Sequence, residues 1–237
     1  MIHRHRSCKK IFRDNSGYTM VELLITVIIG AALLAAVYSS YTVVSRQYRT
    51  ITAMAEVQEA GIPAIRLVSR DLRMAGYMAL DANLQSGFGS INNPIVVTDS
   101  GNACCDRLEI IYDINLTTRY RTTYYTQART NPARNALYVD RENWNGLAWS
   151  AVTTQSLVAD YIEDFQVVTG ATNSLGAPTI ADISMIFRNK NSIPRPARSY
   201  TRPTYNVGNF NLTANDSFHR DEFFSTVYIR NLNEVVY

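Results

Sequence analysis

The feature that most constrains this chain is an apolar run close to its N-terminus. From Val21 to Val44 every side chain is apolar except for Glu22, Thr26, Thr42 and the pair Ser39–Ser40. As a helix rising about 1.5 Å per residue, this run covers roughly 36 Å, enough to cross a hydrocarbon core of about 30 Å. The sequence therefore predicts a membrane-spanning helix over about residues 20–44.

The basic excess of the chain lies entirely before this run. Residues 1–17 hold five basic side chains and one acidic one, a charge of +4, whereas residues 18–237 hold 18 basic and 19 acidic ones, a charge of −1. Because lysine and arginine clusters stay on the cytoplasmic side of a membrane, we expect a cytoplasmic N-terminus and a head outside the inner membrane. A near-neutral remainder has no electrostatic footprint for nucleic acid, and no direct nucleic-acid partner is predicted.

The junction between the basic segment and the apolar run contains a glycine and a glutamate. A secretory signal would have a shorter apolar stretch with a small-residue cleavage site after it, so the better-placed cut lies between Gly17 and Tyr18. Counted from Tyr18, Glu22 is then the fifth residue. A lone carboxylate in hydrocarbon is costly, and the new amine of a neighbouring subunit could neutralise it on assembly. The alternative is an ordinary signal anchor in which Gly17 and Glu22 occur by accident.

Gly17-Tyr18-Thr19-Met20-Val21-Glu22, followed by the apolar helix, resembles the class III signal of type IV prepilins and type II secretion pseudopilins. The resemblance implies that a prepilin peptidase/methyltransferase removes residues 1–17 as a leader, cleaving between Gly17 and Tyr18, and methylates the Tyr18 amine. It also implies that Glu22 acts in assembly. Tyr18 departs from the phenylalanine usual at this position but keeps an aromatic ring.

Helical periodicity continues beyond the predicted span. Apolar residues recur at Ile51, Met54 or Ala55, Val57, Ile62, Ile65, Leu67–Val68 and Leu72, which predicts an amphipathic helix with these residues on its packed face. Gly61 and Pro63 interrupt the pattern and predict a kink near residues 60–63. Gly76 is a plausible residue after the helix C-terminus, so one long helical segment is expected over residues 18–76.

Residues 77–237 change to a β-rich texture. Strand-like runs occur at 94–97, 107–114, 121–128, 136–140, 156–168, 180–188 and 223–230, several of them alternating in hydropathy. Residues 190–217 carry prolines and many Asn, Ser and Tyr residues, and we expect a long surface loop with at most short pieces of structure. The predicted fold class is α+β: one long N-terminal helix, membrane-spanning in its first half, packed on an antiparallel β-rich globular head, as in type IV pilins.

A second resemblance covers the rest of the chain. The blocks "AIRLVSRDLRMAGY" (64–77), "CDRLEIIYD" (105–113), "NALYVDR" (135–141), "LVADYIEDFQVVTG" (157–170), "ADISMIFRNKN" (181–191) and "HRDEFFSTVYIRN" (219–231) are similar, in this order, to the PilW branch of minor pilins. The resemblance implies a minor pilin that helps to initiate type IV pilus assembly at or near the filament tip, with other minor pilins and the major pilin as partners. Two alternatives stay open: a J-type pseudopilin of type II secretion, and an adhesive pilus-tip subunit.

Cys104 and Cys105 are adjacent in the predicted extracytoplasmic head, where an oxidising compartment favours disulfides. A vicinal disulfide, two reduced thiols and an intermolecular bridge are the three alternatives.

The carboxylates Asp160, Glu163 and Asp164 match no calcium loop and are expected to be solvated. His219-Arg220-Asp221-Glu222 has no nucleophile motif nearby and is expected to form a surface turn before the last strand. No catalytic residue, metal or cofactor is predicted.

Tyrosines and arginines are the other side chains that could form a binding surface. The fifteen tyrosines, with Tyr124–Tyr125 and Tyr200/Tyr205 among them, suit either a recognition surface or the strands of a β-rich head. Arg119/Arg121 and Arg195/Arg198/Arg202 are basic groupings with too little net charge for DNA. Neither feature predicts a specific ligand.

Overall fold

The computed structural model describes residues 17–83, 85–101, 104–130, 133–172, 177–193, 195–202, 207 and 212–232. Residues 1–16 of the predicted leader, the last five residues of the head and parts of the predicted 190–217 loop lie outside this set. The chain divides into two compact units, Met1–Gln47 and Tyr48–Tyr237. The boundary falls inside the long N-terminal helix, so the head unit includes the second half of that helix.

Helix α1 (Met20–Met74) is uninterrupted, with Pro63 inside it. The kink expected near residues 60–63 stays a prediction. After Met74 the chain turns, and Gly76 adopts a φ of 72°, the left-handed conformation typical of the residue just past a helix. The Gly76 N–H donates to the Ile111 carbonyl at 2.9 Å, which fastens this turn to the sheet.

The face of α1 that packs on the sheet agrees only in part with the predicted one, since Val57, Val68 and Leu72 are buried as expected. The buried apolar stripe within the head unit consists of small and medium residues at helical spacing: Ala53, Val57, Gly61, Ala64, Val68 and Leu72. Ile51, Met54 and Ile62, expected on the packed face, are 65%, 40% and 37% exposed. The prediction was wrong for these three because it weighted size, whereas a helix laid closely on a sheet needs small residues at the contact.

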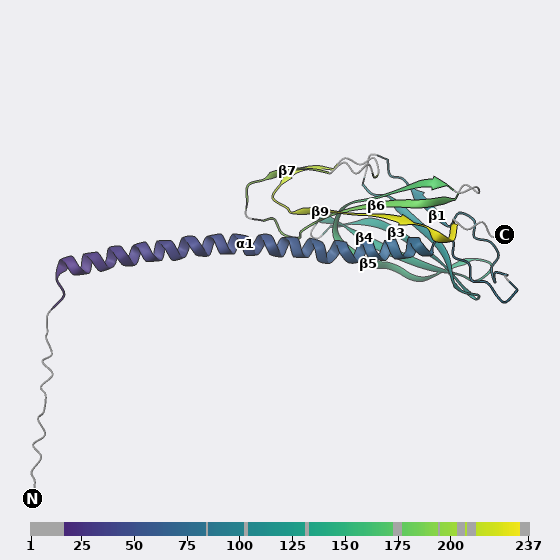
Figure 1. Cartoon of the computed structure of the whole chain (residues 1–237), viewed down its shortest axis with the longest axis horizontal. Helices are drawn as coiled ribbons and strands as arrows, with labels where there is room; N and C mark the ends of the chain where they lie inside the picture. The colour runs from purple at the N-terminus through teal and green to yellow at the C-terminus, as the bar shows by residue number, and fades with distance from the viewer. Residues whose placement is uncertain are drawn as a thin grey trace, which may run out of the picture. The chain divides into compact units, whose positions relative to one another are not determined.

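The head is built on a seven-stranded antiparallel sheet of order β1-β2-β3-β4-β5-β6-β9. Its strands are β1 (Ile95–Thr98), β2 (Arg107–Asn115), β3 (Thr118–Thr130), β4 (Ala133–Trp144), β5 (Trp149–Thr172), β6 (Pro178–Arg188) and β9 (Arg220–Tyr228). Each overlaps one of the seven predicted runs, although β5 is much longer than predicted, and the second half of α1 lies along them (Figure 1). The predicted α+β fold, a long N-terminal helix packed on an antiparallel β head, is confirmed.

The core lies between α1 and one face of the sheet. Inward-facing side chains of the central strands, such as Leu108, Tyr124, Phe165 and Met185, pack with Val68 and its neighbours on the helix and are fully buried. Alternate residues of β5 and β6 point to the opposite face. Asp164, Gln166, Ser184 and Ile186 are nevertheless also 0% exposed there, which shows that this face is covered too.

A second, two-stranded sheet of β7 (Arg198–Thr201) and β8 (Thr213–Asp216) lies within the segment predicted as a loop. This segment leaves the main sheet after β6 and returns at β9. Arg202, at the end of β7, is 8% exposed and bonds to buried groups of β5 and β6. The β7–β8 segment is therefore attached to the sheet.

Candidate functional site: the N-terminal region

The start of α1 forms a capping box. The Thr19 N–H donates to Glu22 Oε2 at 3.4 Å, and the Glu22 N–H donates to Thr19 Oγ1 at 3.2 Å. Each side chain thus satisfies a backbone donor that has no partner within the helix. The Thr-x-x-Glu spacing of residues 19–22 is the sequence signal for this capping box.

Glu22 also lies in the first turn of the helix, where a negative charge is favourable next to the partial positive charge of the helix N-terminus. Its side chain is exposed, as is Tyr18, 85% of whose surface is accessible. Gly17 precedes the helix and is exposed, and a Cβ added to it would meet no atom within 4 Å. The structure therefore presents the Gly17–Tyr18 bond and the Glu22 carboxylate at an accessible helix end.

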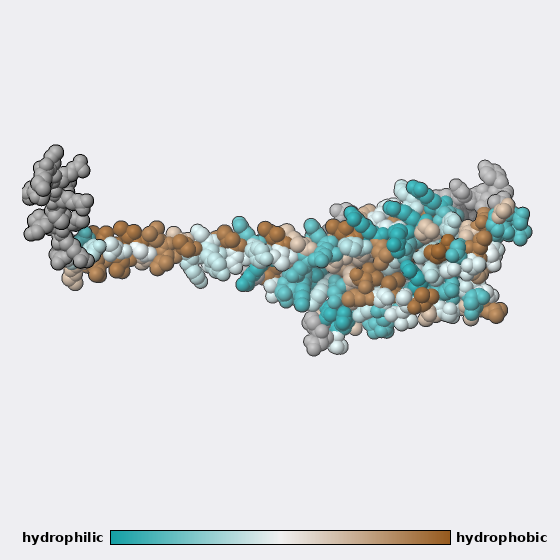
Figure 2. Space-filling view, turned by 90° about the horizontal axis from the view of Figure 1, so that it is seen from below, coloured by the Kyte–Doolittle hydropathy of each residue, from teal (hydrophilic) through white to brown (hydrophobic). Residues whose placement is uncertain are grey.

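The first half of α1 has an apolar surface with nothing packed on it. One helix of the described chain, α1, is long and apolar enough to cross a membrane. Its most apolar stretch of 18 residues is 0% buried. On the face seen in Figure 2, this part of the helix is mostly apolar, whereas hydrophilic and apolar residues are mixed over the head. Such a surface requires lipid or other helices around it, because water would make its exposure costly.

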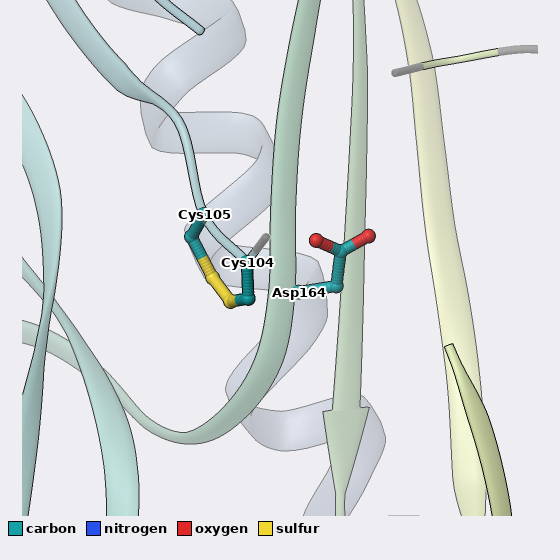
Figure 3. A group of neighbouring side chains, drawn as sticks. All are labelled: Cys104, Cys105 and Asp164. Atoms are coloured by element: carbon teal, nitrogen blue, oxygen red, sulfur yellow. A yellow bond between two sulfur atoms is a disulfide. The ribbon is translucent and has the colours of Figure 1, made fainter. Parts of the chain in front are cut away.

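Cys104 and Cys105 form a disulfide in the structure (Figure 3). The loop that contains them reaches the edge of β5 beyond the point where β4 ends its pairing. There the Asp106 N–H donates to the Phe165 carbonyl at 2.8 Å, and Asp106 Oδ2 accepts from the Val167 N–H at 2.9 Å. The cysteine pair thus lies in a loop that covers backbone groups of an otherwise open strand edge. The vicinal disulfide in the mature protein stays a prediction.

Asp164 lies next to the two cysteines, with its carboxylate and both sulfurs within 4.8 Å of one another. Thiolates bind metals, whereas the sulfurs of a disulfide have no such charge. The carboxylate is also engaged, since Arg202 Nη1 lies 2.7 Å from Asp164 Oδ2 and Gln166 Nε2 donates to Oδ1 at 3.0 Å. In its disulfide form the group is a structural cluster. Burial raises the pKa of Asp164 to about 6, against the lowering effect of Arg202.

The structure separates the three acidic residues of β5. Asp160 pairs with Arg134 at 2.9 Å and Glu163 with Arg220 at 2.5 Å, while Asp164 is 0% exposed. The expectation of solvated side chains was wrong for Asp164, because the β7–β8 segment and the cysteine loop cover its side of the sheet. Alternation along the strand could not reveal this second covering layer.

His219 directly precedes β9, and its Nε2 lies 3.3 Å from Asp221 Oδ2. The neighbouring arginine turns back: Arg220 binds Asp216 and Glu163 and is 9% exposed. The arrangement joins three strands of the head, and Arg220, Asp221 and Glu222 belong to β9, so the surface turn expected at these residues was wrong.

The arginine groupings seen in the sequence are also dispersed. Arg119 is buried against Asp113, with 2.6 Å between Nε and Oδ1, and Arg202 is buried against Asp164. Arg121 pairs with Glu142 at 2.6 Å. These three cations hold the head together and do not form a basic surface.

The tyrosine pair divides between the two faces of β3. Tyr124 is fully buried and donates to Asp71 Oδ2 of α1 at 2.7 Å, whereas Tyr125 is half-buried and donates to Asp140 Oδ1 at 3.2 Å. Tyr200 lies beside Arg220, whose guanidinium carbon is 5.5 Å from its ring centre. Tyr205 lies outside the described residues.

Comparison with known proteins locates the recognisable part of the chain at this N-terminal region. Residues 12–38 match the family model for the prokaryotic N-terminal methylation motif. No curated protein sequence matches the chain. Among solved structures, a type IV-like pilin from Thermus thermophilus is 16% identical, with 72% of this chain and 95% of the pilin covered and a TM-score of 0.49. What the match establishes is a prepilin-type methylation motif that includes Gly17, Tyr18 and Glu22 and extends into the apolar half of α1.

Proposed function

We propose that this chain is a minor pilin, similar to the PilW branch, that helps to initiate assembly of a type IV pilus at the filament tip. The observation that carries the proposal is the methylation motif at residues 12–38, joined to a helix whose apolar first half is wholly exposed. A prepilin peptidase/methyltransferase cleaves between Gly17 and Tyr18 and methylates the Tyr18 amine. The chain acts by binding to other subunits and carries out no reaction.

Assembly exchanges one apolar environment for another. Before assembly the first half of α1 lies in the inner membrane with the head on the periplasmic side, and afterwards the helices of neighbouring pilins surround it. Ile51, Met54 and Ile62 extend the apolar surface past the membrane span, on the side of α1 that the sheet leaves exposed. A neighbouring helix that covers the first half of α1 can continue along these residues, which supports assembly by helix packing.

Glu22 is proposed to pair with the methylated amine of a neighbouring Tyr18. The capping box holds the carboxylate at the helix end and uses it only for a 3.4 Å bond from the Thr19 N–H. A charged amine is a stronger partner for a carboxylate than a neutral amide. In a low-dielectric bundle the unpaired charge would be expensive, so pairing favours the assembled state.

Replacement of Glu22 tests this proposal. Glu22→Ala is expected to be cleaved and methylated normally, as read by mass spectrometry of the membrane fraction, but to be lost from sheared filaments by at least tenfold. Glu59→Ala is the matched control, because Glu59 is an exposed glutamate of the same helix far from the processing site. Normal incorporation of Glu22→Ala would contradict the assembly role.

The partners distinguish a pilus from a secretion pseudopilus. Co-purification of the full chain, in detergent, with the minor pilins encoded beside it would support the pilus. Co-purification with pseudopilins would favour the J-type alternative. An adhesive tip subunit would differ from both in that the purified full chain binds a surface ligand by itself.

A further inference from the structure

A cavity of about 300 Å³ lies in the head unit between α1 and the chain that follows β6. Tyr48, Arg49 and Glu56 line it from the helix, and Asn189 and Asn191 line it from the other side. Its volume is at the lower end of the range for small-molecule sites and suits a group of a few heavy atoms. None of the roles proposed above uses it.

The wall opposite the helix is fixed by hydrogen bonds. Asn189 Oδ1 accepts from the His219 N–H at 2.7 Å, and its Nδ2 donates to the Asn191 carbonyl. The Lys190 N–H donates to Glu56 Oε2 at 3.4 Å, so this loop is also tied to the helix. The cavity is therefore held in shape from both sides.

The helix wall carries one positive and one negative charge. Arg49 and Glu56 are seven residues apart, close to two turns, so they lie on the same side of α1 about 10 Å apart along its axis. The Arg49 guanidinium makes no ion pair or hydrogen bond with any residue that the structure describes. Among the described residues, the Glu56 carboxylate accepts one long hydrogen bond, from the Lys190 N–H. Both charges are thus available to a ligand of mixed charge.

The position of the cavity along the chain indicates where that ligand comes from. The apolar run ends at Val44, and Ser45-Arg46-Gln47-Tyr48-Arg49 follows. Tyrosine and arginine are the residues that favour the membrane–water interface. Five residues of helix span about 7.5 Å, and the polar layer on each side of a bilayer is about 5–8 Å thick. Arg49 is therefore at headgroup depth, and Glu56 lies two turns further from the hydrocarbon.

We propose that this cavity binds the headgroup of an aminophospholipid, phosphoethanolamine, before the chain enters a filament. Arg49 binds the phosphate, and Glu56 binds the terminal ammonium. The charge order matches such a lipid, whose phosphate is nearer the hydrocarbon than its amine. An anionic lipid without the amine would leave Glu56 unpaired and bring a second negative charge near it. The inference rests on the proposed membrane anchoring of α1.

Binding is measured on the processed full chain in detergent micelles by titration calorimetry with three probes: dihexanoyl phosphatidylethanolamine, dihexanoyl phosphatidylglycerol and free O-phosphoethanolamine. We expect the first to bind at least tenfold more tightly than the other two. Arg49→Gln should weaken its binding at least tenfold, and Glu56→Gln should remove the preference over phosphatidylglycerol. Arg66→Gln and Glu59→Gln, exposed positions of the same helix outside the cavity, should bind as the unmodified chain does.

Unchanged binding in Arg49→Gln would overturn the inference, and equal affinity for free O-phosphoethanolamine would overturn the lipid as its source. Carbonate extraction and processing of the same chain are followed in parallel. A chain that is processed and retained in membranes but insensitive to Arg49→Gln would refute the headgroup site alone. A chain that is neither processed nor retained would refute the proposed function, and the headgroup inference with it.

Discussion

Asp71 is a carboxylate in the face of α1 that packs on the sheet, with 1% of its surface exposed. Tyr124 Oη donates to its Oδ2 at 2.7 Å, and Arg70 donates to its Oδ1 through Nε at 3.0 Å and Nη2 at 2.9 Å. Burial, followed by the nearby carboxylate, raises the pKa of the Tyr124 hydroxyl, so this group remains a donor at any ordinary pH. The pair ties α1 to β3 through the core.

Tyr124→Phe should lower the free energy of unfolding by about 1–3 kcal/mol, because the buried Asp71 oxygen loses its donor while the ring volume stays the same. Tyr125→Phe is the matched control, since Tyr125 donates to Asp140 on the half-exposed face of the same strand. Its loss should cost less than about 1 kcal/mol. Urea unfolding of the full chain in micelles, followed by tryptophan fluorescence, measures both. Equal costs would contradict the role given to the Tyr124–Asp71 bond.

At the scale of elements, Gly61 sets how closely α1 approaches β9. A Cβ at this position would lie 2.1–2.4 Å from three ring carbons of Phe223. The ring cannot simply move away, because it packs edge-on against the fully buried Phe187, with 5.9 Å between ring centres. The glycine that suggested an interruption of the helix is thus a contact point within a continuous helix.

Gly61→Ala should destabilise the head by about 1–3 kcal/mol through overpacking, even though alanine is the better helix former by about 1 kcal/mol. The penalty should largely vanish when the same change is made in a Phe223→Ala background, because the clashing ring is then absent. Urea unfolding followed by tryptophan fluorescence measures the unfolding free energies of the unmodified chain, the two single variants and the double variant. An equal penalty in both backgrounds would show that Phe223 is not the cause.

The strands were predictable because each carries its own local signal of β-branched and aromatic residues in alternation. The packed face of α1 was predictable only in part, through Val57, Val68 and Leu72. Ala53, Gly61 and Ala64 give almost no hydropathy signal, yet they are buried because small side chains let the sheet come close. The β7–β8 sheet was hidden for a related reason: two four-residue strands in a polar, proline-containing segment have too few residues for a periodic pattern.

Over the whole head, two arginines attach the β7–β8 segment to the outer face of the sheet: Arg220, through Asp216 of β8, and Arg202. Arg202 lies 2.7 Å from Asp164 of β5, donates to Ser184 Oγ of β6 at 2.8 Å and is 3.5 Å from Glu222 of β9. Burial raises the pKa of Asp164 to about 6; Arg202 and Gln166 lower it, and the charge of Asp106 raises it again. Stability of the head should therefore depend on pH in a definite direction.

An aspartate in the unfolded chain titrates near pH 4, so between about pH 4 and 6 folded Asp164 keeps a proton that the unfolded chain has released. The stabilising contribution of this group is thus largest at low pH and is lost as pH rises through 6. The unfolding free energy of the unmodified chain relative to Asp164→Asn should fall by roughly 2 kcal/mol between pH 4 and pH 7.5. Urea titrations across this range measure the difference. A difference that is constant, or that grows with pH, would contradict the assignment.

Features that depend on neighbours along the chain could be predicted from the residues alone: the apolar run, the charge change at Gly17, the position of Glu22, and the seven strands of the main sheet. These follow from composition and short periodicities, which act before any long-range contact forms. Long-range packing settles that Ala53, Gly61 and Ala64 belong to the buried face of α1, that Asp164 lies under a second layer, and that Arg49 and Glu56 line a cavity with Asn189. Those outcomes depend on how closely distant segments approach one another, and no local pattern of side chains encodes that distance.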